Sequence, residues 1–240
     1  MKPNICISFD VEEFDLPLEY GLEISIEKQL EIGFKGLQAI MPILDLPGVR
    51  CTLFTTAFFA EHFPEEIKRL SEKHEIASHT YYHSTFETKD LLASRLKLEE
   101  ITGKPVSGLR MPRMKDVPVK DIIYAGYTYD SSVHPTWIPG RYNHFDLPRT
   151  EYVDKGLRRI PASVSPLIRI PLFWLAFKNF PLWFYKLVAK WTYKTDKTLM
   201  LYFHPWEFTD LSEFNLPAYI VNGSSGQNLK KLQDFVSSLK

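Results

Sequence analysis

Short apolar runs alternate with longer stretches of mixed character along almost the whole chain. Residues 5–9 form an apolar, β-rich run that ends at acidic residues, which is typical of a buried strand. After this run, Leu30, Phe34 and Leu37 recur at helical spacing and predict a helix over residues 24–41. By the same criteria we predict strands at residues 51–55, 75–78, 107–110, 127–129, 159–162 and 199–203, and helices at residues 58–74, 90–102 and 227–239.

This alternation predicts an α/β fold in which parallel strands are joined by crossover helices. About seven such strands are enough to close into a barrel. The chain has 240 residues and shows no internal repeat and no low-complexity linker, so a single domain over residues 1–240 is expected. In folds of this kind, ligands bind at the carboxyl ends of the strands.

The amino-acid composition argues against a nucleic-acid-binding protein and against a membrane-spanning one. The chain carries 29 basic and 29 acidic residues, so it lacks the basic excess of nucleic-acid-binding domains, and no nucleic-acid partner is expected. No uncharged apolar run reaches the roughly 18–20 residues of a membrane span. The first residues lead directly into the first strand, unlike a signal peptide, and there are only two cysteines. The expected location is therefore the cytoplasm, with a peripheral position at the inner membrane face as an alternative.

Ionisable residues stand where five of the seven predicted strands end. They are Asp10 with Glu12, His79 with His83, Arg110, Asp130 and His204. Because the carboxyl ends of parallel strands meet at one side of the fold, these side chains are expected to share one site.

His79 and His83 follow a strand directly and stand four residues apart, a spacing that points both imidazoles the same way. Two imidazoles and one carboxylate make a three-ligand site with an open position, which is the pattern of catalytic zinc. The sequence thus predicts one divalent ion, with zinc the expected one. The alternative is a pair of histidines at a helix start that bind only backbone.

At these residues the sequence resembles the polysaccharide deacetylases of carbohydrate esterase family 4. The first strand of that family ends Thr-Phe-Asp-Asp, and residues 8–12 read Ser-Phe-Asp-Val-Glu in its place. The family motifs His-Ser/Thr-x-x-His and Arg-x-Pro are matched at residues 79–83 and 110–112, and its last motif histidine is matched by His204. The strings Asp-Val-Glu, Tyr-Asp-Ser-Ser and His-Pro-Trp-Glu point to one subgroup of the family.

The resemblance implies a distorted (β/α) barrel of about seven parallel strands that hydrolyses an N- or O-acetyl group with the help of a metal ion. It makes Asp10 the general base, held by a bidentate Arg110, and His204 the general acid. His79 and His83 become metal ligands. Val11 occupies the position of the family's second aspartate and has no donor atom, so Glu12 is the expected third ligand and Asp15 the alternative.

Three further residues receive expected roles, the first of them by analogy with the same family. The backbone N–H of Arg113 follows the Arg-x-Pro proline and is expected to stabilise the oxyanion. Asp130 is expected to orient His204 or Arg110, against the alternative of an ordinary strand-end carboxylate. Trp206 is expected to form a substrate-binding wall, because aromatic faces stack on sugar rings; packing in the core is the alternative.

The function predicted on these grounds is deacetylation of a sugar or glycan, including lipid- or nucleotide-linked precursors. Two alternatives stay open. One keeps the metal but acts on a non-carbohydrate amide, as allantoinase-like proteins do, and the other is a non-catalytic sugar-binding protein of the same fold.

The charge is unevenly distributed. Residues 155–195 hold eight basic and no acidic residues, and the same stretch is rich in aromatic residues. Pro171 and Pro181 divide it, so residues 171–194 cannot span a bilayer. The alternatives are a barrel helix that faces the core or a second subunit of a homo-oligomer, contact with a membrane surface or a lipid-linked substrate, and contact with another anionic substrate.

Overall fold

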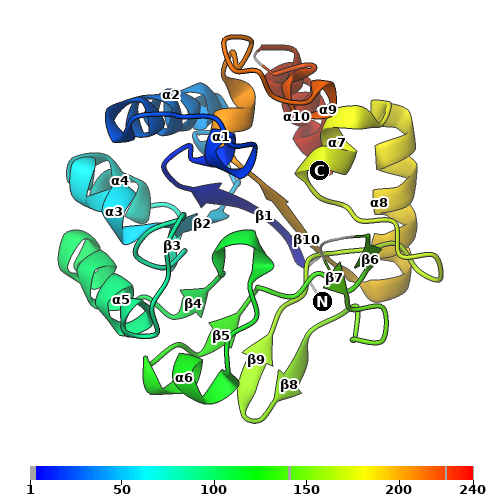
Figure 1. The fold of residues 1–240 in the computed structure, drawn as a ribbon. Coiled ribbons are helices and arrows are strands. Elements are labelled where there is room, and N and C mark those ends of the chain that lie inside the picture. The colour runs from blue at the N-terminus through cyan, green and yellow to red at the C-terminus, as the bar shows by residue number, and fades with distance from the viewer. Residues whose placement is uncertain (1–3, 140–141, 225, 240) are drawn as a thin grey trace.

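Eight strands form one curled sheet in the computed structural model, which describes residues 4–139, 142–224 and 226–239 (Figure 1). The strand order is β10-β1-β2-β3-β4-β5-β9-β8. The bounds are β1 Asn4–Val11, β2 Cys51–Thr55, β3 Glu75–Ser78, β4 Gly108–Leu109, β5 Tyr129–Asp130, β8 Tyr152–Asp154, β9 Leu157–Arg159 and β10 Thr198–Phe203. A separate antiparallel pair joins β6 Trp137–Ile138 to β7 Tyr142–Asn143.

The predicted α/β barrel fold with about seven parallel strands is confirmed, and the sheet curls into a half-barrel whose two ends are β10 and β8. Seven strands of the sheet run parallel, and β8 alone is antiparallel, to β9. Strand β8 was not predicted from the sequence. It forms a hairpin with β9 through Lys155 and Gly156, both at positive φ (48° and 92°). Such a turn matches the twist of the two strands that it joins.

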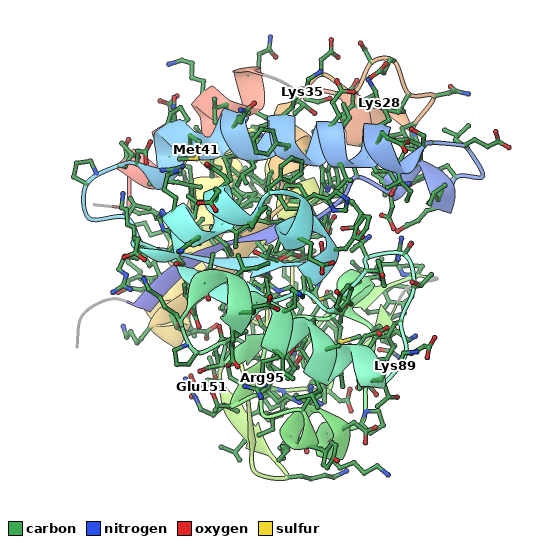
Figure 2. All side chains as sticks on the ribbon, turned by 90° about the vertical axis from the view of Figure 1, so that its left-hand side faces the viewer. Lys28, Lys35, Met41, Lys89, Arg95 and Glu151 are labelled. Atoms are coloured by element: carbon green, nitrogen blue, oxygen red, sulfur yellow. The ribbon has the colours of Figure 1, made fainter. Side chains whose placement is uncertain are left out.

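Helices cover the outer side of the curled sheet (Figure 1). The longer ones are α2 Ile26–Leu44, α4 Pro64–Ser71, α5 Lys89–Thr102, α8 Leu182–Asp196 and α10 Gly226–Ser237. The shorter ones are α1 Leu16–Glu19, α3 Ala57–His62, α6 Val119–Tyr124, α7 Trp174–Asn179 and α9 Ala218–Val221, with 3-10 turns at Pro112–Met114 and Pro205–Phe208. Figure 2 shows α2 from the side, with Lys28 and Lys35 on its outer surface.

The single helix predicted over residues 58–74 is wrong in one respect, because two helices occupy this stretch. Phe63 leaves helical dihedral angles (φ −130°, ψ 52°), and Pro64 begins α4. A proline inside a helix lacks the N–H that the preceding turn needs, whereas in a first turn that donor is not required.

The aromatic, basic segment at residues 171–194 forms α7 and α8. Within the described ranges, no helix is both long and apolar enough to cross a membrane.

Two glycines bring α2 close to the loops that follow β1 and β10. A Cβ added to Gly33 would lie 2.4 Å from the carbonyl oxygen of Glu12, and one added to Gly36 would lie 2.4 Å from the carbonyl carbon of Pro205. Both loops carry residues of the predicted site, so these two glycines let the helix support the site directly.

We expect Gly36→Ala to destabilise the protein by about 1–3 kcal/mol, because the added methyl group overlaps backbone that cannot move aside. The measurement is the urea midpoint of unfolding. Gly226→Ala is the matched control, since its Cβ would meet no atom within 4 Å. An unchanged midpoint for Gly36→Ala would mean that α2 and the loop after β10 are further apart than described here.

Candidate metal centre and active-site cleft

A cleft opens at the carboxyl ends of the strands. Most of the site residues predicted from the sequence line it, namely Asp10, Glu12, His79, His83, Arg113, His204 and Trp206. Arg110 lies just beneath the cleft and is fully buried, whereas Asp130 is buried outside it.

Glu12, His79 and His83 come together as a three-residue cluster that could hold a metal ion, with one ligand atom from each within 4.8 Å of the others. Glu12 Oε2 lies 3.1 Å from His79 Nε2 and 3.3 Å from His83 Nε2. This oxygen is buried and accepts no hydrogen bond from any residue that the structure describes. A buried carboxylate oxygen that faces two imidazole nitrogens fits a bound cation.

The protonation of His83 supports the same interpretation. Burial lowers its pKa, but the carboxylates of Glu12 and Asp15 outweigh burial and raise the pKa to about 9. A positive charge is therefore favoured between these two carboxylates. A divalent cation bound there would replace the proton.

The prediction that helical spacing points the imidazoles of His79 and His83 the same way is wrong. Residues 79–88 form a loop, and the two rings lie 5.5 Å apart at 26°. Thr80 adopts a positive φ of 64°, which is costly for a β-branched residue. Its N–H donates to Ser78 Oγ (3.1 Å) and its hydroxyl to the carbonyl of Tyr82 (3.0 Å), and these bonds hold the turn that brings His83 back beside His79.

A second layer of contacts orients each of the three candidate ligands. Asp15 Oδ1 lies 2.6 Å from His83 Nδ1, and the carbonyl of Arg110 lies 2.7 Å from His79 Nδ1. The indole N–H of Trp206 donates to Glu12 Oε1 (2.9 Å), which leaves Oε2 to face the histidines. Partners on the far nitrogen of a histidine orient the ring and fix its tautomer at metal sites. Asp15, the alternative third ligand, thus lies behind His83, and Glu12 is the carboxylate in the candidate cluster.

If β1 continued past Val11, strand alternation would point Glu13 away from the site that Asp10 and Glu12 share, and this expectation from the sequence is wrong. The side chain of Glu13 is buried, accepts from the backbone N–H of His83 (2.8 Å) and accepts from Thr56 Oγ1 (2.7 Å). The chain leaves β1 at Val11, so the strand alternation on which the expectation rested ends one residue before Glu12.

Asp10 is held by Arg110, through one nitrogen only. Arg110 Nη1 donates to Asp10 Oδ1 (2.6 Å) and to Ser8 Oγ (2.9 Å), so the predicted bidentate pair is not formed. The other nitrogens of the guanidinium donate to Ser131, and its plane lies over the Phe54 ring at 4.0 Å. Arg110 thus contacts β1, β2 and the residue that follows β5, and Asp10 Oδ2 is left facing the cleft.

His204 lies across from this oxygen, with its Nε2 at 3.8 Å from Asp10 Oδ2. The buried carboxylate of Glu207 binds the other side of the same residue, at 3.2 Å from Nδ1 and 2.5 Å from the backbone N–H. Burial lowers the pKa of His204, but the bond to Glu207 and the nearby carboxylates of Glu12 and Asp10 raise it overall. The imidazolium form of His204 is therefore favoured beside Asp10.

Two predicted roles are corrected by the contacts. Asp130 binds Arg159 (2.6 Å) and Ser132, and lies against neither His204 nor Arg110. Trp206 lines the cleft but is only 2% exposed, because His204 stacks on it at 4.7 Å. Its ring face is thus covered and cannot stack on a sugar. Trp206 instead positions Glu12 and His204.

Arg113 lies at the rim of the cleft with a positive φ of 56°. Its guanidinium donates to Asp15 Oδ2 (2.9 Å), to the carbonyl of His83 (2.9 Å) and to Glu19. These bonds tie Arg113 to the residues behind the candidate metal ligand His83.

Several residues that line the cleft were given no role from the sequence, and one of them, Trp174, contacts the candidate site residues His204 and Trp206. It packs edge-on against His204 (5.2 Å) and Trp206 (5.4 Å). It belongs to no motif, and only the aromatic richness of residues 171–194 hinted at it.

A family model described as polysaccharide deacetylase matches residues 34–128, which include His79, His83 and Arg110 but neither the end of β1 nor His204. No curated protein matches the sequence. Among solved structures, the chain is similar to a putative polysaccharide deacetylase from Mycobacterium smegmatis, at 19% identity and a TM-score of 0.65, covering 98% of this chain and 83% of that one.

A probable polysaccharide deacetylase from Pseudomonas aeruginosa is similar at 13% identity and a TM-score of 0.66, covering 98% and 84% of the two chains. PuuE allantoinase is similar at 14% identity and a TM-score of 0.60, covering 98% and 83%. At these identities the structural likeness shows a shared barrel fold. The match of the family model covers 95 of the 240 residues, and this match alone relates that part of the chain to the polysaccharide deacetylases.

Proposed function

We propose that this protein is a metal-dependent deacetylase that removes an N- or O-acetyl group from a sugar or glycan, lipid- or nucleotide-linked precursors included. The observation that carries the proposal is the arrangement of one cleft. Three candidate ligand atoms of Glu12, His79 and His83 lie together there, beside a carboxylate held by an arginine and a histidine held by a glutamate. The match to the polysaccharide deacetylase model supports the reaction class.

Glu12, His79 and His83 would hold the ion through Oε2 and the two Nε2 atoms. Zinc is the expected ion, because two imidazoles and a carboxylate with an open position suit it. When bound, such an ion lowers the pKa of a water molecule towards about 7 and polarises a carbonyl group.

The residues of the chain supply the proton transfers. Asp10 Oδ2 faces the cleft and takes a proton from the attacking water, while the buried guanidinium of Arg110 keeps the carboxylate in place. His204 gives a proton to the departing nitrogen or oxygen, and Glu207 favours its protonated form. The backbone N–H of Arg113 is the proposed donor to the oxyanion.

The direct test is acetate release from N- and O-acetylated sugars by the zinc-loaded protein, with and without a chelator. We expect release that the chelator abolishes and added zinc restores. A cyclic amide such as allantoin serves as the second substrate class. Hydrolysis of allantoin without acetate release would show that the substrate is a non-carbohydrate amide. If the protein binds zinc but acts on none of these substrates, the proposal is contradicted.

We expect Glu12→Gln to weaken zinc binding at least about tenfold, because the amide keeps the shape of the side chain but removes the negative charge that faces both imidazoles. Metal affinity is measured by competition with a chromogenic chelator. Glu23→Gln removes an exposed carboxylate and should leave affinity unchanged. If Glu12→Gln and wild type bind zinc with equal affinity, the third ligand is Asp15 or Asp10 and not Glu12.

The pH dependence of the rate tests the pairing of His204 with Glu207. A general acid must be protonated, so the rate should fall as the pH rises through the pKa of His204, and Glu207 raises that pKa. Glu207→Gln should therefore move the alkaline limb of kcat/KM to lower pH, and metal content should not change. An unmoved limb would show that another group gives the proton.

A further inference from the structure

Helix α8 exposes a row of large apolar side chains to solvent. Trp183, Leu187 and Trp191 are 68%, 59% and 38% exposed. They stand four residues apart, so at about 100° per residue they lie within roughly 80° of one another on the helix surface. The opposite face of α8 is buried in the core through Tyr185, Val188, Ala189 and Thr192, which places the exposed row on the outside of the barrel (Figure 1).

A row of lysines runs beside the apolar row. Lys186, Lys190 and Lys194 also stand four residues apart, and the first two directly precede Leu187 and Trp191 in the sequence. None of the three takes part in an ion pair among the residues that the structure describes. No acidic residue occurs in the segment 155–195. The outer face of α8 therefore combines aromatic and aliphatic side chains with uncompensated positive charge.

We propose that this outer face of α8, formed by the two rows, binds the surface of an anionic lipid bilayer, with the helix lying parallel to the membrane plane. Tryptophan side chains are favoured at the boundary between headgroups and acyl chains, and lysines beside them are attracted to anionic headgroups. The helix has 15 residues and is about 22 Å long, shorter than the roughly 30 Å core of a bilayer, so it lies on the membrane.

The charge distinguishes this partner from a second copy of the chain. In a symmetric dimer the same surface meets itself, so two rows of three lysines would be brought close together and would repel one another. An anionic bilayer neutralises the same lysines. The inference does not depend on the reaction in the cleft.

The test is co-sedimentation of the full-length protein with vesicles of phosphatidylcholine alone or with 30% phosphatidylglycerol. We expect at least tenfold tighter binding to the anionic vesicles, and weaker binding at high salt because lysine–headgroup attraction is screened. Two triple variants should each bind the anionic vesicles at least tenfold more weakly. One replaces the apolar row (Trp183→Ala/Leu187→Ala/Trp191→Ala), and the other replaces the lysine row (Lys186→Gln/Lys190→Gln/Lys194→Gln). Because these side chains are exposed or partly exposed, both variants should fold, which circular dichroism checks.

Leu92→Ala/Leu96→Ala is the matched control. These leucines are also exposed and four residues apart, at 37% and 50%, but α5 lies on the other side of the barrel (Figure 1). This variant should bind vesicles like wild type. Equal binding to both vesicle types, no binding to either, or full binding by the triple alanine variant would overturn the proposal. So would a concentration-dependent dimer in sedimentation velocity that the triple alanine variant abolishes.

Discussion

Replacing His79 or His83 by alanine should leave the protein without a bound divalent ion and reduce acetate release to background. Each histidine contributes one of the three candidate ligand atoms, and both face the same buried oxygen of Glu12. A site reduced to two ligands holds zinc far more weakly. Metal content per chain, measured by mass spectrometry after gel filtration, is the primary measurement.

Thermal stability gives a second measurement that does not depend on a substrate. An ion that binds only the folded state stabilises it, so zinc should raise the Tm of wild type but not that of either variant. His62→Ala is the control, because His62 is exposed on α3, outside the cleft. Equal metal content in wild type, His79→Ala and His83→Ala would rule out the proposed centre.

Replacing Asp10 by asparagine should keep the metal and lower kcat by about 10²–10⁴, the usual contribution of a positioned general base. Asparagine preserves the shape of the side chain but cannot take a proton from water. The substitution also removes the carboxylate partner of the buried Arg110 and should cost stability, so the rate is measured below the unfolding transition.

Asp130→Asn separates these two effects. Asp130 is equally buried and equally paired with an arginine, Arg159 at 2.6 Å, but it does not line the cleft. It should therefore lose stability while keeping kcat within a few-fold of wild type. Full activity of Asp10→Asn, or matching rate losses in the two variants, would show that Asp10 does not act as the base.

The alternating pattern of strands and helices was sufficient to predict the barrel, because parallel strands buried on both faces read as short apolar runs. Once the barrel is predicted, chain position alone brings the residues after β1, β3, β4 and β10 to one side of the fold. For this reason Asp10, Glu12, His79, His83, Arg110 and His204 could be assigned to one site from the sequence, and their positions around the cleft agree with that assignment. Pro64 is typical of a helix first turn, and α4 does begin there, but the helical period on both sides of it gave no sign of the break at Phe63. The β8–β9 hairpin was harder to predict, because a short turn at positive φ leaves a weak signal.

Only the tertiary structure decided what each of these side chains contacts. The strained turn at Thr80 brings the histidines together, and Asp130 turns to Arg159, 29 residues further along the chain. Trp206 binds Glu12 across 194 residues, and Asp15 reaches His83 across 68. The direction of a buried polar side chain depends on which partner can satisfy it, and such partners come from distant segments whose distances are set only when the chain has packed.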